Sequence, residues 1–334
     1  MEYGDKHILV LGAGASGIGA SWVLAQVGAH VVLNDYKPVT LPATEEGRLV
    51  SAGVEIITGR QDESLLDGVD RIVISPGISL DIPIVKAAQA RGIDVVSEVE
   101  LAYEVSKSPI VAVTGTNGKT TTTTLLTKVL EGSGKPVCVG GNIGDSLSEV
   151  AYSMPAGGFL VAELSSYQLE TIKHFRPIGA IMLNITPDHL ARHKTMENYI
   201  AAKERIFENQ LKSDYLVLNI DDSVVADMEH RAPSHILQIS QKQTVENGAY
   251  YANGQCYVVK NGVATAVIGD EDIHIPGSHN IENILTVIAL TYALGVPVVE
   301  IHRIISEFHG VEHRLERVKT IDGITSVSYT HLTL

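Results

Sequence analysis

The sequence predicts an α/β protein with two domains, each built on a mainly parallel sheet. Short apolar runs alternate with helical patterns along residues 7–219, which is typical of parallel strands joined by crossover helices. Two glycine-rich turns, at 12–17 and 115–118, each follow an apolar run and precede a helical pattern. Asn-Gly pairs then divide the stretch 245–275 into short segments, which indicates hairpins.

The first domain is expected over residues 1–97 as a Rossmann-like parallel sheet. Helices are expected through Trp22 and in IPIVKAAQARG (82–92). The strands are expected in HILVL (7–11), AHVVLND (29–35), VEIIT (54–58) and RIVIS (71–75).

The second domain is expected over residues 98–312, joined to the first near residues 97–107. A helix should begin near Thr120, and another should run from about Ser278 to Leu294. Strands are expected in IVAVT (110–114), PVCVGGN (136–142), FLVAE (159–163), AIMLN (180–184) and YLVLN (215–219). The pairs Asn247-Gly248, Asn253-Gly254 and Asn261-Gly262 each predict a type I′ turn, and together a small antiparallel meander.

Composition limits the classes of function. The 334 residues suffice for two domains, and 45% of them are hydrophobic. The formal net charge of -14 argues against a nucleic-acid or anionic-membrane partner, because both require a basic face. No apolar run reaches the length of a membrane span, and no secretory pattern precedes the first strand. We therefore expect a soluble, cytoplasmic protein whose Cys138 and Cys256 are free thiols. A monomer is a separate expectation.

The first glycine-rich loop reads L11-GAGASG-I18, which is the G-x-G-x-x-G pattern between a strand and a helix. This pattern is typical of NAD or FAD sites, but it specifies only a close approach of backbone to phosphate. Another nucleotide diphosphate, or a purely structural turn, fits it as well. Asp35 could bind a ribose hydroxyl or simply end the second strand.

The second loop, G115-T-N-G-K-T120, resembles a P-loop in which Val113 replaces the first glycine. Lys119 would reach the β- and γ-phosphates of a nucleotide, and the Thr120 hydroxyl would bind Mg²⁺. A P-loop also requires an acid at the tip of a neighbouring strand, and FLVAE ends in Glu163. A plain glycine-rich turn is the alternative.

Other polar residues have open interpretations. His189 and His193 have the spacing of a zinc pair, but no third soft ligand accompanies them, and His193 is expected at the surface. Asn280 could contact a nucleotide or be solvated, with Ser278 capping the helix. Arg314 lies in a charged run that would otherwise be solvated.

Taken together, the motifs resemble the Mur ligase family. They are T114-GTNGKTT-T122, G141-NI-G144, E163-LSSYQL-E170, N184-ITPDHLAR-H193, Y199-IAA-K203, G277-SHNIE-N283 and H313-R314. S75-PG-I78 and E98-VELA-Y103 resemble most the members that add D-glutamate. The resemblance implies an ATP-dependent amide ligase of peptidoglycan precursor synthesis. It would join D-glutamate to UDP-N-acetylmuramoyl-L-alanine through an acyl phosphate, releasing ADP and phosphate.

The resemblance also implies the site residues. The UDP-sugar would bind at Gly14, Ala15, Ser16, Asp35, Tyr36, Lys37, Gly77, Asn142 and Gln168. ATP would bind at Gly115, Thr116, Asn117, Gly118, Lys119, Thr120, Thr121, Asn280, Asn283 and Arg314. Mg²⁺ would bind at Thr120, Glu163, His189 and Lys203, with Lys203 as a carbamate formed from CO₂, and the catalytic residues would be Lys119, His189 and Lys203.

The chain departs from the family pattern at its end. After Thr325 the sequence SVSYTHLTL (326–334) replaces the expected linker, so residues 313–334 are interpreted as the start of a linker with an atypical tail. We expect the third, amino-acid-binding domain to be absent and ligation by this chain to be undetectable. Three alternatives stay open: a Mur ligase of different amino-acid specificity, an inactive UDP-sugar-binding fragment, and a Rossmann dehydrogenase, which the P-loop and Glu163 oppose.

Overall fold

The computed structural model describes residues 3–311, 314–321 and 324–329, the last two ranges by backbone only. The chain forms two compact units. Unit 1 comprises Met1–Thr114, Cys138–Ile178 and Pro187–Leu211. Unit 2 comprises Gly115–Val137, Gly179–Thr186 and Lys212–Leu334. These units are not the domains expected from the sequence, whose boundaries stay a prediction.

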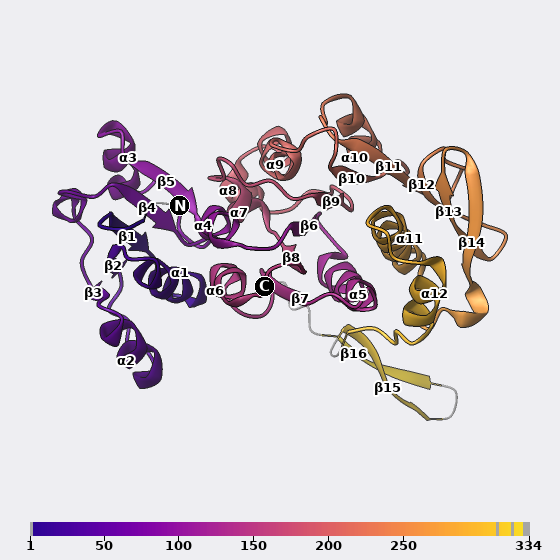
Figure 1. The fold of residues 1–334 in the computed structure, drawn as a ribbon, viewed down its shortest axis with the longest axis horizontal. Coiled ribbons are helices and arrows are strands. Elements are labelled where there is room, and N and C mark those ends of the chain that lie inside the picture. The colour runs from indigo at the N-terminus through magenta and orange to yellow at the C-terminus, as the bar shows by residue number, and fades with distance from the viewer. Residues whose placement is uncertain (1–2, 312–313, 322–323, 330–334) are drawn as a thin grey trace. The chain divides into compact units, whose positions relative to one another are not determined.

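Unit 1 begins with a five-stranded sheet in the order β3-β2-β1-β4-β5, with every pair parallel. The strands are β1 (His7–Leu11), β2 (His30–Asp35), β3 (Glu55–Thr58), β4 (Arg71–Ile74) and β5 (Asp94–Ser97). The helices are α1 (Ala15–Gln26), α2 (Ala43–Ser51), η1 (Glu63–Leu66), α3 (Pro83–Ala90) and α4 (Glu98–Val105). The predicted Rossmann-like sheet is therefore confirmed (Figure 1).

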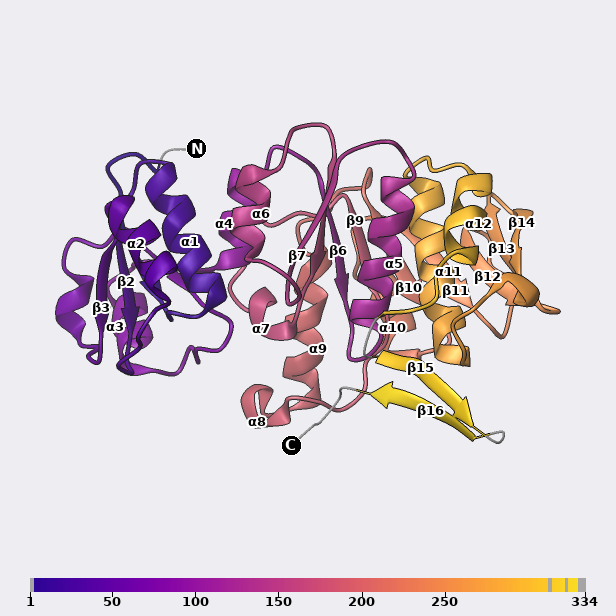
Figure 2. The same cartoon turned by 90° about the horizontal axis from the view of Figure 1, so that it is seen from below.

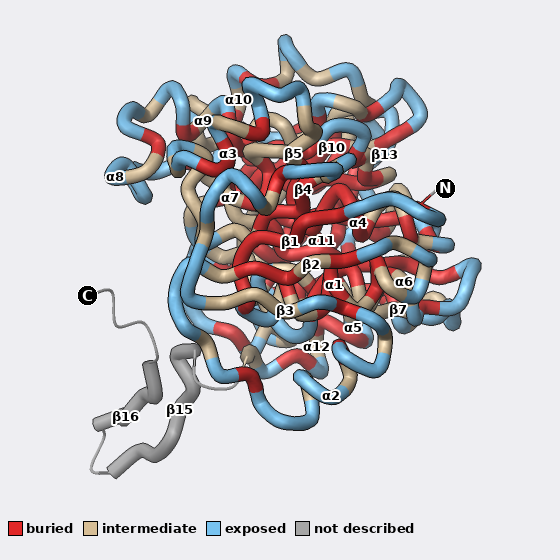
Figure 3. The backbone as a smooth tube through the Cα atoms, turned by 90° about the vertical axis from the view of Figure 1, so that its left-hand side faces the viewer, coloured by how far each residue is buried: buried red, intermediate tan, exposed pale blue. Residues whose placement is uncertain are grey.

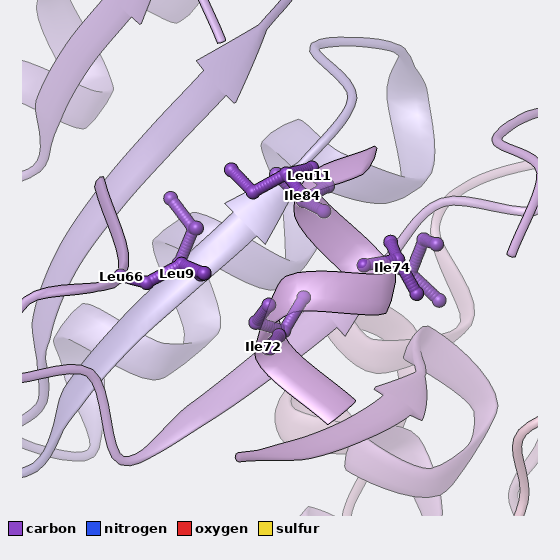
Figure 4. Packing of buried hydrophobic residues seen from close by; sticks show 8 residues of the cluster. Leu9, Leu11, Leu66, Ile72, Ile74 and Ile84 are labelled. Carbon is purple, nitrogen blue, oxygen red and sulfur yellow. The ribbon is translucent and has the colours of Figure 1, made fainter. Parts of the chain in front are cut away.

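Helices cover both faces of this sheet, because its strands are apolar on both sides. Leu9 and Leu11 of β1 pack with Ile72 of β4 and with Ile84 of α3 in one buried cluster (Figure 4). Helix α1 contacts β1 and β2. The burial of β1 is visible in Figure 3, where nearly all of the strand is red. In a parallel sheet of this kind, ligands bind at the loops that follow the carboxyl ends of the strands.

The rest of unit 1 contains three further strands in the order β6-β8-β7 and several short helices. The strands are β6 (Ile110–Thr114), β7 (Val137–Gly141) and β8 (Phe159–Glu163). The helices are α6 (Leu147–Ser153), α7 (Ser166–Leu169), α8 (Leu190–His193), α9 (Met196–Glu204) and η2 (Arg205–Phe207). Strands β6 and β8 are parallel and pair Val113 with Glu163, so Thr114 and Glu163 come at the same end of the sheet.

Unit 2 contains strands in the order β14-β13-β12-β11-β10-β9, and β9 to β12 pair in parallel. The strands are β9 (Gly179–Met182), β10 (Tyr215–Asn219), β11 (His235–Ser240), β12 (Gly248–Ala252), β13 (Gln255–Lys260) and β14 (Val263–Gly269). The helices are α5 (Lys119–Glu131), α10 (Ser223–Ala226), η3 (Asp227–His230), η4 (Asp270–Asp272), α11 (Ser278–Ala293) and α12 (Val298–Ser306). Helix α5 packs against α11 and α12 (Figure 2).

Two of the three predicted Asn-Gly hairpins are confirmed and one is wrong. Asn253-Gly254 and Asn261-Gly262 have positive φ at both residues and join antiparallel strands, as a type I′ turn requires. Asn247-Gly248 instead leads into a parallel pairing of β11 with β12. The meander is therefore limited to β12, β13 and β14.

Residues 313–334 were interpreted from the sequence as the start of a linker with an atypical tail, and the described backbone of this stretch contains strands. The backbone forms β15 (Arg314–Ile321) and β16 (Ile324–Tyr329), which pair antiparallel. Within the described part of the chain, no helix combines the length and apolar character needed to cross a membrane. Cys138 is partly buried, Cys256 is fully buried, and both are free as predicted.

Candidate functional site

The first glycine-rich loop connects β1 to α1 at the carboxyl end of the first sheet. A Cβ on Gly12 would lie 2.8 Å from Ser75 Oγ, and a Cβ on Gly17 would lie 1.7 Å from the carbonyl oxygen of Gly12. Both positions therefore require glycine. Gly14, before the first residue of α1, has open space around it. The N-terminus of α1 therefore has free space beside it, and anion binding there stays a prediction.

Asp35, at the end of β2, holds this loop in place. Its Oδ2 accepts a hydrogen bond from the Ala13 N–H at 3.0 Å, and its Oδ1 accepts one from the Lys37 N–H at 3.0 Å. The side chain does more than end a strand, because it connects the loop after β2 to the loop after β1. Tyr36 is 70% exposed beside it, and Lys37 and Gly77 are also exposed.

Asn142 and Glu163 lie together where β7 and β8 end. The Asn142 N–H donates to the Glu163 carbonyl at 2.8 Å, and its Nδ2 donates to Glu163 Oε1 at 3.0 Å. Gly141 makes this approach possible, since a Cβ there would lie 2.4 Å from the Glu163 carbonyl oxygen. Glu163 is 1% exposed, and its Oε2 has no hydrogen-bond partner among the residues described. A buried carboxylate oxygen without a donor is suited to a cation.

Lys203 is buried in α9 with 2% exposure. Its Nζ donates to Thr114 Oγ1 at 3.4 Å and lies 5.0 Å from the centroid of the Tyr199 ring. Thr114 is the residue directly before the P-loop in the sequence. The structure therefore excludes a solvated position for this lysine.

His189 and His193 have different environments. His189 has a left-handed backbone with φ 53°, its side chain is 46% exposed, and Nε2 lies 3.3 Å from Asp188 Oδ2. His193 is buried, so the surface position expected from sequence is wrong. Its Nε2 lies 2.9 Å from Ser166 Oγ, and its Nδ1 lies 3.5 Å from Glu170 Oε1. Burial lowers the pKa of His193, which favours the neutral ring.

Arg192 connects this region to the first sheet, a connection that the sequence did not indicate. Its guanidinium donates to Glu170 Oε2 at 2.6 Å and to the Pro76 carbonyl at 3.1 Å. It also lies over the Tyr167 ring, 4.4 Å from the centroid. Pro76 precedes Gly77, so Arg192 holds one of the predicted UDP-sugar segments.

The P-loop lies in unit 2 between Gly115, with φ 147°, and the start of α5. Asn184, for which the sequence predicted no role, binds the P-loop backbone at Asn117. The Asn184 Oδ1 accepts from the Asn117 N–H at 2.8 Å, and the Asn184 Nδ2 donates to the Asn117 carbonyl at 3.1 Å. Lys119 Nζ donates to the carbonyls of Gly115 at 3.1 Å and Thr116 at 2.8 Å. Thr120 and Thr121 lie in the first turn of α5 and are partly buried.

Asn280 and Asn283 of α11 are both buried, so the solvated alternative for Asn280 is wrong. Asn283 Oδ1 accepts from the Thr122 hydroxyl at 3.1 Å, and its Nδ2 donates to Asn280 Oδ1 at 3.1 Å. Asn280 Nδ2 donates to the Pro276 carbonyl at 2.7 Å. These contacts connect α11 to the helix that begins at the P-loop.

Gln168 and Arg314 are two further residues that the sequence predicts in the site. Gln168 is buried, and its Oε1 accepts from the N–H and hydroxyl of Ser165, both at 2.9 Å, in a capping box. Its amide oxygen is therefore occupied within the protein. The side chain of Arg314 lies outside the described residues. No cluster of three or more His, Cys, Asp or Glu side chains suited to a metal occurs in the described part.

Comparisons with known proteins identify relatives over nearly the whole chain. Residues 113–291 match the family model described as Mur ligase middle domain, and residues 6–97 match the one described as Mur ligase MurD-like, N-terminal domain. A UDP-N-acetylmuramoylalanine--D-glutamate ligase of Thermoanaerobacter pseudethanolicus is 44% identical over 97% of this chain and 71% of its own length. One of Caldanaerobacter subterraneus is 45% identical over the same shares.

Solved structures agree on the fold. The UDP-N-acetylmuramate:L-alanyl-gamma-D-glutamyl-meso-diaminopimelate ligase of Neisseria meningitides has a TM-score of 0.62 at 22% identity, covering 92% of this chain and 99% of that one. The UDP-N-acetylmuramate-alanine ligase MurC of Thermotoga maritima has a TM-score of 0.54 at 22% identity, covering 97% of this chain and 74% of that one.

Proposed function

The chain belongs to the Mur ligase family, and from this membership we propose that it joins D-glutamate to UDP-N-acetylmuramoyl-L-alanine with consumption of ATP. The observation that carries the proposal is 44% identity to a D-glutamate ligase over 97% of the chain. The reaction belongs to peptidoglycan precursor synthesis. The presence of two glycine-rich anion loops agrees with it, because ATP and the sugar nucleotide both carry phosphates.

The reaction proceeds in two steps. The terminal carboxylate of the L-alanyl group attacks the γ-phosphorus of ATP, giving an acyl phosphate and ADP. The amine of D-glutamate then attacks the acyl carbon, loses a proton and expels phosphate, leaving an amide. Lys119 provides a fixed positive charge for the transferred phosphoryl group.

The UDP part of the first substrate is assigned to the loop after β1. The exposed N-terminus of α1 at Gly14, Ala15 and Ser16 supports binding of the diphosphate. The exposed Tyr36 ring, next to Asp35, could stack on the uracil base. Lys37, Gly77, Asn142 and Gln168 complete the proposed sugar-nucleotide residues. The P-loop with Asn280, Asn283 and Arg314 is assigned to ATP.

Mg²⁺ is proposed to bind at Glu163, with His189, Thr120 and Lys203 as further ligand positions. The unpartnered, buried Oε2 of Glu163 fits a hard cation. When bound, Mg²⁺ supplies positive charge that reduces repulsion between a carboxylate and a triphosphate. Asn142 orients the Glu163 carboxylate by its bond to Oε1.

We further propose that Lys203 is carbamylated. Its neutral amine would attack CO₂, form an N–C bond and lose a proton, which converts a cationic side chain into an anionic oxygen ligand. The burial of the side chain beside Thr114, the residue directly before the P-loop, supports this step, because a carbamate at this position would lie where the P-loop begins. We also propose that the protein acts as a monomer in the cytoplasm, where ATP and sugar nucleotides occur.

Calorimetry with UDP-N-acetylmuramoyl-L-alanine, ATP and NAD tests the proposal. The sugar nucleotide and ATP should bind, and NAD should not. Binding of NAD alone would overturn the ligase in favour of a dehydrogenase. Binding of the sugar nucleotide without ATP would favour a sugar-nucleotide-binding protein. D-Glutamate dependence of phosphate release in the full-length protein, against other amino acids, tests the acceptor.

A further inference from the structure

The segment E98-VELA-Y103 was noted in the sequence, but the proposed function gives it no role. Its first residue, Glu98, begins α4 and is 1% exposed. The Oε1 atom accepts a hydrogen bond from the Ser146 hydroxyl at 2.6 Å and another from the Ser148 N–H at 2.7 Å. Ser146 and Ser148 lie at the start of α6, so Glu98 binds the first turn of that helix.

Helix α1 contacts the same turn from another direction. A Cβ on Gly19 of α1 would lie 2.2 Å from Ser146 Oγ, so the backbone of α1 lies directly against Ser146. Farther along, Trp22 of α1 packs edge-on against Tyr152 of α6, with 5.7 Å between ring centroids. Helices α1, α4 and α6 contact one another in pairs, as Figure 2 shows.

Both helices that meet at Ser146 directly follow loops that contain proposed sugar-nucleotide residues. Helix α1 begins directly after Gly14, in the first glycine-rich loop. Helix α6 follows residues 142–146, the short loop that contains Asn142. A shift of the first turn of α6 would move Asn142, and it would alter the packing of α1.

We propose that Glu98 is a positioning residue for sugar-nucleotide binding: its hydrogen bonds to Ser146 and Ser148 hold α6 against α1 and thereby hold the loop that carries Asn142. This inference rests on the proposed function, because it assumes that Gly14 and Asn142 belong to the sugar-nucleotide site. Glu98 itself contacts no substrate in this proposal.

The surroundings of Glu98 indicate that it acts as a hydrogen-bond acceptor. No cation pairs with it among the described residues, and its Oε2 has no hydrogen-bond partner there. Burial raises the pKa of the Glu98 carboxyl, which favours the neutral acid. Glutamine presents the same carbonyl acceptor without the charge, so it should replace Glu98 in this role.

The test compares four variants and one control variant by thermal unfolding and by calorimetry with UDP-N-acetylmuramoyl-L-alanine and with ATP. Glu98→Ala should raise the Kd for the sugar nucleotide about tenfold, because two buried donors lose their acceptor, and should leave the Kd for ATP within about twofold. Glu98→Gln should restore the sugar-nucleotide Kd to within about threefold of wild type.

The third variant disturbs the same turn without changing Glu98. Gly19→Ala should also weaken sugar-nucleotide binding selectively, whereas the control Gly47→Ala, in open space on α2, should not. The fourth, Glu104→Gln, changes a carboxylate on α4 that pairs with Arg71 at 3.0 Å. It should lower the Tm and leave both Kd values unchanged.

Several results would overturn the inference. They are an equal rise of both Kd values in Glu98→Ala, a fall in Tm without any change of Kd, or a glutamine variant as weak as the alanine variant. If Glu98→Ala does not fold, Glu98→Gln and Gly19→Ala still decide the question. Failure of the wild-type chain to bind the sugar nucleotide would contradict the proposed function instead, before any variant is compared.

Discussion

Gly118 and Asn283 are in direct contact, and a Cβ on residue 118 would lie 2.6 Å from Asn283 Oδ1. Gly118 also has φ 86°, a conformation that costs other residues about 1–2 kcal/mol. The shape of the P-loop therefore depends on Asn283 of α11, a residue that the family resemblance assigned to ATP binding.

Gly118→Ala should weaken ATP binding, because both the backbone strain and the contact with Asn283 move the P-loop. We expect at least a tenfold rise in the Kd for ATP, from about 1.4 kcal/mol or more of lost binding. Calorimetry measures it, with Gly47→Ala as the control. An ATP Kd equal to that of wild type would contradict this view of the loop.

Lys119→Ala removes the fixed cation of the P-loop. The loss should amount to several kcal/mol of transition-state stabilisation in phosphoryl transfer, measured as kcat/KM for ATP in the full-length protein. Sugar-nucleotide binding should survive, because the loop after β1 is unchanged. Loss of sugar-nucleotide binding with unchanged ATP affinity would mean that the two loops had been assigned the wrong way round.

Glu163→Gln tests the proposed metal ligand. The variant can keep the hydrogen bond from Asn142 to Oε1, but it replaces the unpartnered Oε2 with an amide nitrogen that cannot bind a cation. The Mg²⁺ concentration needed for half-maximal activity of the full-length protein should rise by about tenfold or more. An unchanged Mg²⁺ dependence would remove Glu163 from the metal site.

Lys203→Ala tests the carbamate. The full-length variant should be nearly inactive, and short carboxylic acids should partly restore activity, because they supply the missing anionic oxygen. Lys194→Ala is a matched control, since Lys194 is an exposed lysine near the start of α9. Full activity of the Lys203 variant would rule out a catalytic role for this residue.

His193 should make stability depend on pH. Because its folded-state pKa lies below the usual value of 6.5, the unfolded chain binds the proton more readily. The neutral His193 ring therefore contributes fully to the free energy of unfolding above pH 6.5. This stability is lost as the pH falls below that value, by at most about 1.4 kcal/mol per pH unit. Denaturant unfolding of wild type and His193→Gln between pH 7.5 and 5.5 measures the difference. Parallel pH profiles would contradict the prediction.

Much of the fold follows from local sequence, because β1 and β2 each contain a short apolar run and each glycine-rich turn needs its glycines for close backbone contacts. Asn247-Gly248 shows where local reasoning fails. The same dipeptide that forms a type I′ turn at residues 253–254 and 261–262 precedes a strand that pairs with β11, and that choice depends on residues far from the dipeptide.

The site was predictable to a similar extent. The positions of Lys119 at the start of a helix and of Glu163 at the end of a strand follow from their motifs. The contact of Thr122 with Asn283 joins residues 161 positions apart, and no pattern in either segment indicates it. The burial of His193 was missed because a four-residue helix has too little periodicity to show which side faces the core.

The hydrogen bonds from Lys119 to the carbonyls of Gly115 and Thr116 have a practical consequence. The ammonium group is bonded to the protein's own carbonyl oxygens, so an arriving phosphate must compete with them. Nucleotide binding is then an exchange of partners, and part of its enthalpy is cancelled by the bonds that break. Inorganic phosphate or sulfate in a buffer would enter the same competition, so affinities measured in such buffers would understate the strength of the loop for ATP.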